Sequence, residues 1–107
     1  MAHYVVLGTY TAEGKKTLRE GSDRRNRVKE MAAEMGVTWK DWYLLMGEYD
    51  FMVTLEAPND QLVVQFAATV GSYGFVTTQT MRAFTETETD DILTSLPDVG
   101  VGIFVVE

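Results

Sequence analysis

The sequence predicts an α+β fold, a ferredoxin-like sandwich in which two helices cover one face of a four-stranded antiparallel sheet. Segments rich in β-forming residues alternate with helical stripes in the order β-α-β-β-α-β, and an extra helix and a tail strand follow. The only two prolines, at positions 58 and 97, stand between predicted elements. The second face of such a sheet stays open unless something covers it.

Four segments have the composition and alternation of β-strands. They cover residues 3–10, 37–46, 49–56 and 75–84. In the third segment every second side chain is apolar, which places on one face Tyr49, Phe51, Val53 and Leu55. Only positions 47–48 separate the second and third segments, so we expect a tight hairpin turn there.

Two helical segments follow the first strand. Thr11 can cap a short helix over residues 13–20, and Gly21 interrupts it. Ser22 can cap a second helical segment over residues 23–35. The apolar positions of this second segment recur at helical spacing and predict a buried stripe of Val28, Met31, Ala32 and Met35.

The second half of the chain predicts two more helices and a tail. Residues 58–60 end the third strand and can cap a helix whose buried stripe is Leu62, Val63, Phe66, Ala67 and Val70. Thr85 begins an acidic stretch, and acidic residues favour a helix N-terminus, so we expect a short C-terminal helix. Residues 99–106 predict a tail strand, and the segment 98–107 is a candidate intersubunit strand of one domain spanning residues 1–107.

Composition excludes several kinds of chemistry. The 107 residues include no cysteine, which excludes disulfides, thiolate metal sites, iron–sulfur clusters and cysteine nucleophiles. The formal net charge is −7, so nucleic acids and anionic membranes are poor partners. No apolar run reaches the roughly 18 residues that span a bilayer, and glycines show no phosphate-loop spacing. We expect a cytoplasmic protein without a metal or cofactor.

Basic residues are concentrated in one stretch of this acidic chain. Seven of the nine lysines and arginines lie between Lys15 and Lys29. This pattern has two interpretations, a solvated helix face or a local site for an anion.

Two tryptophans and the single histidine are further candidates for a functional role. Trp39 and Trp42 stand three residues apart in a predicted strand, so we expect them on opposite faces. One would then pack in the core, and the other would face a partner subunit or a ligand. His3, the single histidine, is expected to be structural or incidental, because no recognisable ligand spacing accompanies it.

Asp50 and Arg24 each allow two interpretations. Asp50 either fixes the turn at Gly47 by accepting hydrogen bonds from backbone amides or lies against another subunit. Arg24 lies four residues before Val28 on the predicted helix stripe. Its side chain either extends to solvent or directs an anion-binding guanidinium toward the sheet.

Five short motifs occur in a fixed order along the chain. They are Thr11-x-x-Gly14, Arg24 before a helix that ends at Gly36, Tyr43-x-x-Met46-Gly47-x-Tyr49-Asp50, Glu56-Ala57-Pro58, and Thr78-x-Thr80-x-Arg82-Ala83-Phe84-Thr85. Together they resemble the GYD-domain family, small bacterial and archaeal proteins, over about residues 4–97. The family's Gly-Tyr-Asp signature stands in this chain as Gly47-Glu48-Tyr49-Asp50.

The resemblance implies an architecture more than an activity. The family is similar to the dimeric α+β barrel group, in which two ferredoxin-like units pack their open sheet faces together. Relatives of that architecture include cofactor-free enzymes, haem enzymes and modules that sense amino acids. The resemblance therefore implies a homodimer or a higher homo-oligomer, and fold alone does not fix its function.

Three functional hypotheses follow. In the first, a small molecule binds between sheet and helices, with Thr11, Arg24, Trp42 and Tyr49 as candidate ligand-binding residues. In the second, a cofactor-free enzyme of monooxygenase or isomerase type transfers a proton through Tyr49 or Asp50. The third is a structural assembly module. We expect Tyr49 between sheet and helices, within reach of Arg24, and Asp50 on the open face.

Overall fold

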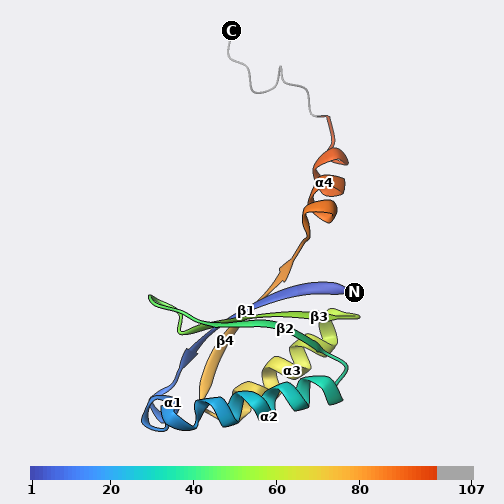
Figure 1. Cartoon of the computed structure of the whole chain (residues 1–107). Coiled ribbons are helices and arrows are strands. Elements are labelled where there is room, and N and C mark those ends of the chain that lie inside the picture. Colours follow the sequence, from blue (N-terminus) through green and yellow to red (C-terminus); the bar gives the residue numbers. More distant parts are fainter. Residues whose placement is uncertain (99–107) are drawn as a thin grey trace.

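A computed structural model describes residues 1–98 and confirms the α+β sandwich with a four-stranded antiparallel sheet (Figure 1). The strands are β1 (Ala2–Tyr10), β2 (Thr38–Leu44), β3 (Phe51–Ala57) and β4 (Val76–Ala83). Their order in the sheet is β2-β3-β1-β4, and each neighbouring pair is antiparallel. The tail strand predicted over residues 99–106 lies outside the described residues.

Helices cover one face of this sheet. The chain forms α1 (Ala12–Lys16), a 3-10 helix η1 (Leu18–Glu20), α2 (Gly21–Glu34), α3 (Asp60–Ser72) and α4 (Glu86–Thr94). In Figure 1, α2 and α3 lie below the sheet, whereas α4 extends away on the other side. The sandwich therefore has two layers, with the core between the sheet and α2 and α3.

Side-chain caps begin three of the helices as the sequence predicts. The Thr11 hydroxyl accepts a hydrogen bond from the amide of Gly14, at 3.2 Å, and the Asn59 side chain accepts one from Leu62, at 3.0 Å. Thr85 and Glu88 form a reciprocal capping box at the start of α4. These bonds satisfy amide groups that have no partner within a helix.

The predicted start of α2, at residue 23, is wrong. Gly21 is the first residue of α2 and has helical backbone angles, with φ −61° and ψ −36°, instead of interrupting the helix. Ser22 lies inside the first turn and caps nothing. The preceding 3-10 helix η1 leads directly into α2, so the chain reaches helical geometry without a side-chain cap.

Alternating side chains of the two central strands supply most of the core. On β1 and β3, the residues that face the helices are buried: Tyr4, Val6, Phe51, Val53, Leu55 and Ala57. Ala32 from α2 and Val63 and Phe66 from α3 are buried against them, and Val28 and Met31 pack at the edge of the same cluster. The Tyr4 hydroxyl donates to the Asp60 carboxylate at the start of α3, so this buried phenol keeps a polar partner.

The connection between β2 and β3 is longer than predicted. We expected a tight turn at positions 47–48, but β2 ends at Leu44 and β3 begins at Phe51. Gly47 has φ +119°, in the region that favours glycine. Tyr49 and Asp50 therefore lie before the strand, where the alternation of β3 does not determine the direction of their side chains.

A bulge in β2 overturns the prediction for the two tryptophans. Trp39 pairs with Leu55, and Trp42 pairs with Val53, so three steps along β2 match two steps along β3. Such an extra residue reverses the alternation on the bulged strand. Both tryptophans therefore lie on the helix side of the sheet, where both pack against the core, instead of on opposite faces.

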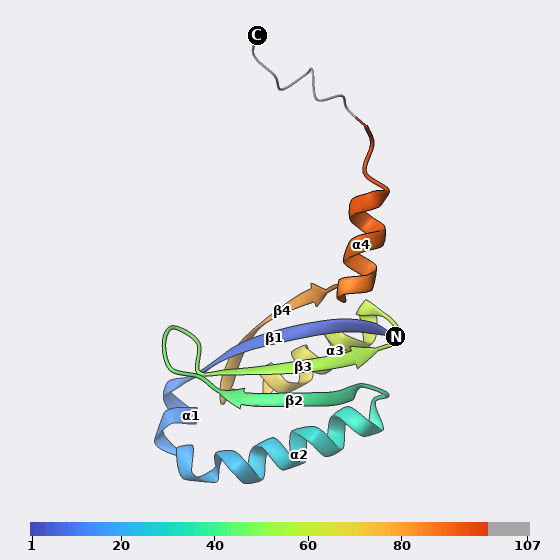
Figure 2. The ribbon, with the colours of Figure 1, turned by 45° about the horizontal axis from the view of Figure 1, so that its top comes forward.

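The other face of the sheet has no helix over it in the described chain. We call open face the side chains that alternate with the core, with Val5 and Leu7 of β1, Tyr43 of β2, Met52 of β3 and Met81 of β4 as its large apolar members. In Figure 2, α4 projects beyond the end of β4 and leaves this face uncovered. Apolar side chains of the projecting segment are exposed as well: Phe84, Ile92, Leu93 and Leu96.

One close approach between β1 and β3 generates a stability prediction. Gly8 pairs with Phe51, whose ring lies so close that a Cβ atom on Gly8 would be 2.0 Å from the ring carbon Cζ. We expect Gly8→Ala to displace the ring and lower the free energy of unfolding by about 1–3 kcal/mol.

The matched control is Gly21→Ala in α2, where an added Cβ meets nothing within 4 Å. This change should raise the free energy of unfolding by about 0.5–1 kcal/mol, because alanine has the higher helix propensity. Urea unfolding monitored by circular dichroism measures both. A Gly8→Ala protein as stable as the parent would show that the ring does not depend on Gly8.

Candidate functional site

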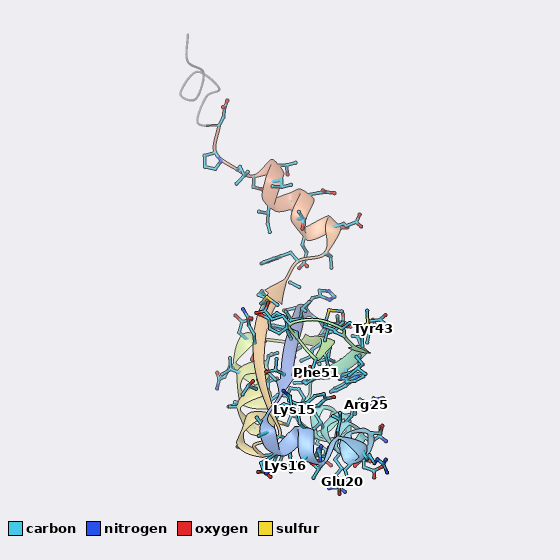
Figure 3. The ribbon with its side chains drawn as sticks, turned by 90° about the vertical axis from the view of Figure 1, so that its left-hand side faces the viewer. Lys15, Lys16, Glu20, Arg25, Tyr43 and Phe51 are labelled. Atoms are coloured by element: carbon cyan, nitrogen blue, oxygen red, sulfur yellow. The ribbon has the colours of Figure 1, made fainter. Side chains whose placement is uncertain are left out.

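A pocket of about 560 Å³ lies between the sheet and the two covering helices. Its sheet side is formed mainly by aromatic and aliphatic residues of all four strands: Val6, Tyr10, Trp39, Trp42, Phe51, Val53 and Val76. Its helix side is formed by α2 and α3, including Val28, Met31, Phe66, Ala67 and Val70. Figure 3 views the molecule from the end that carries α1 and labels Phe51 on the sheet and Arg25 on the helix side.

The charged residues that line the pocket all have the same sign. They are Arg24, Arg25 and Arg27 of α2, and no aspartate or glutamate of residues 1–98 lines the pocket with them. The chain as a whole has 16 acidic and nine basic residues. The pocket is therefore a local positive region in an acidic protein, as the anion-site interpretation of the basic stretch requires.

Three aromatic rings form one continuous wall of the pocket. The Phe51 ring is stacked with the Trp42 ring at 5.9 Å between centroids and 19° between planes. The Tyr10 ring is tilted by 46° to the Phe51 ring, with the two centroids 5.6 Å apart. Offset and tilted ring pairs at such distances are favourable, so the wall is held by packing within the sheet.

Arg24 is held in place by its own surroundings. Its guanidinium donates to the hydroxyl and the carbonyl of Thr17, at 3.0 and 2.9 Å, and lies 4.3 Å from the centre of the Phe75 ring. Glu20 is 3.9 Å away. The side chain is 19% exposed, so it does not extend freely into solvent. Arg24 therefore lines the pocket with two hydrogen bonds already donated to Thr17 and a carboxylate nearby.

Arg25 is differently placed. Its guanidinium lies over the Trp42 ring, with Cζ 4.7 Å from the ring centre. Within residues 1–98 it has neither a hydrogen bond nor an ion pair. A guanidinium that contacts an aromatic face keeps its N–H donors directed sideways, in its own plane. Arg25 thus offers free donors at an apolar pocket.

Asp50 joins three segments through the backbone. Its Oδ2 accepts a hydrogen bond from the amide of Tyr10, at 2.8 Å, and its own amide donates to the carbonyl of Gly8, at 2.8 Å. Its carbonyl accepts from the amide of Leu45, also at 2.8 Å. The Asp50 side chain therefore accepts from a backbone amide, but this amide belongs to β1 and not to the turn at Gly47. A catalytic role for this residue stays a prediction.

Tyr10 carries the phenol that faces the pocket. Burial raises the pKa of Tyr10 and the nearby Asp50 carboxylate raises it further, whereas Arg25 and Arg24 lower it. The phenol therefore stays protonated at neutral pH and can donate a hydrogen bond. Tyr10 was not among the candidates from the sequence, because a tyrosine at the end of a β-rich segment gives no sign of the pocket beside it.

Tyr49 does not lie where we predicted. Its hydroxyl donates to the side-chain carbonyl of Gln79, at 3.0 Å. Gln79 pairs with Leu7, so it belongs to the open face. The placement between sheet and helices, near Arg24, is wrong because the loop before β3 carries Tyr49 to the other side. Its catalytic or binding role stays a prediction.

The remaining candidates have structural contacts. Thr11 caps α1, and its hydroxyl donates to the carbonyl of Gly74, at 2.6 Å, which ties α1 to the turn before β4. Trp42 lines the pocket. His3 on β1 is 3.6 Å from Glu56. No three metal-ligating side chains of residues 1–98 gather around a common point.

No helix within residues 1–98 combines the length and the apolar character that crossing a membrane requires.

Comparison with solved structures supports the fold. The chain of FFRP-DM1 superimposes with a TM-score of 0.58 and 21% identity, over 78% of this chain and 100% of that one. MtbAldR gives 0.62 and 14%, over 79% of this chain and 52% of that one, so the similarity spans about half of MtbAldR. The hypothetical protein PHS023 from Pyrococcus horikoshii gives 0.52 and 24%, over 80% and 93%. At these identities the likeness shows the fold alone.

Sequence comparison identifies the family. A protein of Thermus thermophilus named glutamine synthetase and cystathionine beta-lyase binding protein is 32% identical over 84 residues, which are 78% of this chain and 88% of that protein. The family model for the GYD domain matches residues 4–93, which include β2 to β4, α1 to α3 and most of β1. The chain belongs to the GYD-domain family.

Proposed function

We propose that this protein is a homo-oligomeric binding protein that takes up a small molecule in the pocket between the sheet and α2 and α3. The observation that carries the proposal is the pocket itself. Its volume of about 560 Å³ lies within the usual range of ligand sites, and its lining is apolar and aromatic with a few convergent polar groups.

The named relative supports a binding function over a catalytic one. The Thermus thermophilus protein is named for binding two enzymes, which makes protein partners a reasonable expectation for this chain as well. A small domain that holds a ligand on one side of its sheet has the other side free for another protein. We propose that ligand occupancy and protein contacts use these two faces.

The open face supports self-association. Val5 and Leu7 of the central strand and Met52 and Met81 beside them form an apolar surface on a sheet that no helix covers within residues 1–98. The projecting α4 adds exposed apolar side chains at Ile92, with 45% exposure, and at Leu93, with 57%. A surface of this kind is usually covered by a partner, and a second copy is the simplest one.

Tryptophan fluorescence provides a direct test of the pocket, since both tryptophans of the chain line it. The neutral probe N-phenyl-1-naphthylamine should bind and accept excitation energy from them. We expect Ala67→Phe, which fills the pocket from α3, to weaken this binding at least tenfold. The matched change Ala68→Phe, at the exposed neighbouring position, should leave it unchanged. Equal binding by both variants, or no binding by the parent, would overturn the proposed pocket.

Light scattering after size exclusion tests self-association. We expect a mass of at least twice 12.0 kDa at micromolar concentration. Val5→Lys places a charge on the open face and should shift the protein toward the monomer, with a dissociation constant at least tenfold higher. Val64→Lys is the control, because Val64 is exposed on α3. A parent mass of 12.0 kDa would exclude self-association through this face and leave it to a different protein.

A further inference from the structure

The distribution of charge in the pocket indicates which molecules it accepts. Three arginines of α2 line it, and no acidic side chain of the described chain lines it beside them. A cationic ligand would be repelled by Arg25, which has no ion-pair partner within residues 1–98. A neutral ligand that covered the half-buried Arg25 would take its free N–H donors out of water without giving them a partner, which is unfavourable. An anionic group would be attracted to Arg25 and would accept hydrogen bonds from its N–H groups.

Arg25 is the residue best placed to bind that anion. Arg24 already donates two hydrogen bonds to Thr17 and has Glu20 at 3.9 Å, so part of its hydrogen-bonding capacity and charge is already used. Arg25 has no such partner within residues 1–98, and contact with the Trp42 ring, 4.7 Å from its Cζ, fixes its position. A guanidinium held in this way loses little conformational freedom when a carboxylate binds in its plane.

The aromatic and aliphatic lining of the pocket indicates the shape and polarity of the uncharged part of the ligand. Beside Arg25 lie the stacked rings of Trp42 and Phe51, and then aliphatic side chains such as Val53 and Val70. A small inorganic anion or a polyphosphate would leave most of this apolar surface without contact. A flat apolar skeleton that carries one acidic group fits both the rings and the charge.

We propose that the ligand of this pocket is an organic monocarboxylate with an aromatic or similarly flat apolar body, and that Arg25 binds its carboxylate. This inference rests on the proposed function of the pocket as a small-molecule site. The Tyr10 hydroxyl is the second donor, because it lies on the same aromatic wall. The Asp50 carboxylate lies near Tyr10 and accepts from the Tyr10 amide, 2.8 Å away, but Asp50 does not line the pocket.

A matched set of probes tests the charge preference on the full-length protein. The probes are 2-naphthoate, 2-naphthamide and 2-naphthylmethylamine, which share one ring system and carry a negative, a neutral and a positive group at neutral pH. Isothermal titration should show 2-naphthoate binding roughly tenfold or more tightly than the amide, as expected for charge-assisted hydrogen bonds. The amine should bind most weakly.

Substitution of Arg25 tests the residue assignment. We expect Arg25→Gln to remove the preference for 2-naphthoate over 2-naphthamide, while amide binding stays within about twofold of the parent. Unchanged amide binding also shows that the variant is folded. Arg19→Gln is the matched control, since Arg19 belongs to the same basic stretch but does not line the pocket. It should keep the full preference.

The binding results distinguish a wrong ligand class from a wrong pocket. If all three probes bind with similar affinity, the pocket stands and the assignment of an anionic ligand is wrong. If 2-naphthoate is preferred equally by the parent and by Arg25→Gln, the anion is bound elsewhere and the role of Arg25 is wrong. If none of the probes binds at millimolar concentration, the pocket itself is not a site and both proposals fall together.

Discussion

The site depends on Asp50, which links the end of β1 to the loop between β2 and β3 through three hydrogen bonds to the backbone. The amide of Tyr10, the carbonyl of Gly8 and the amide of Leu45 all bond to this one residue, each at 2.8 Å. Asp50 therefore holds the loop between β2 and β3 against the end of β1. Because Phe51 follows it directly, the same bonds set the ring that lies on Gly8 and stacks with Trp42. The aromatic wall of the pocket is thus built from residues next to one anchored position.

In the proposed function, the two faces of the sheet have separate tasks. Its helix side carries the pocket, whose arginines come from α2 and whose rings come from the strands. Its open side carries apolar residues, and α4 with its exposed Ile92 and Leu93 extends beyond the sheet. Ligand and partner therefore need not compete for the same surface.

Regular features of this fold could be predicted from the sequence, and irregular ones could not. The alternation of β3 from Phe51 onward gave the buried face correctly, and Thr85 gave the start of α4, because both follow from local geometry. The bulge in β2 is set by pairing with β3, and it moved Trp39 to the helix side. The long loop before β3 likewise moved Tyr49 away from the pocket. Arg24 was a candidate, but Arg25 was not, since only the position of Trp42 in space distinguishes the free guanidinium from the occupied one.

The most direct test of this account is nuclear magnetic resonance of the side-chain N–H groups during titration with 2-naphthoate. The Nε–Hε resonance of Arg25 and the indole N–H resonance of Trp42 should shift together along one saturable binding curve, since the two side chains are in contact at the pocket. The resonance of Arg19, which does not line the pocket, should stay in place. Binding of 2-naphthoate that leaves Arg25 and Trp42 unshifted would contradict the central claim, because the acid would then bind outside the pocket.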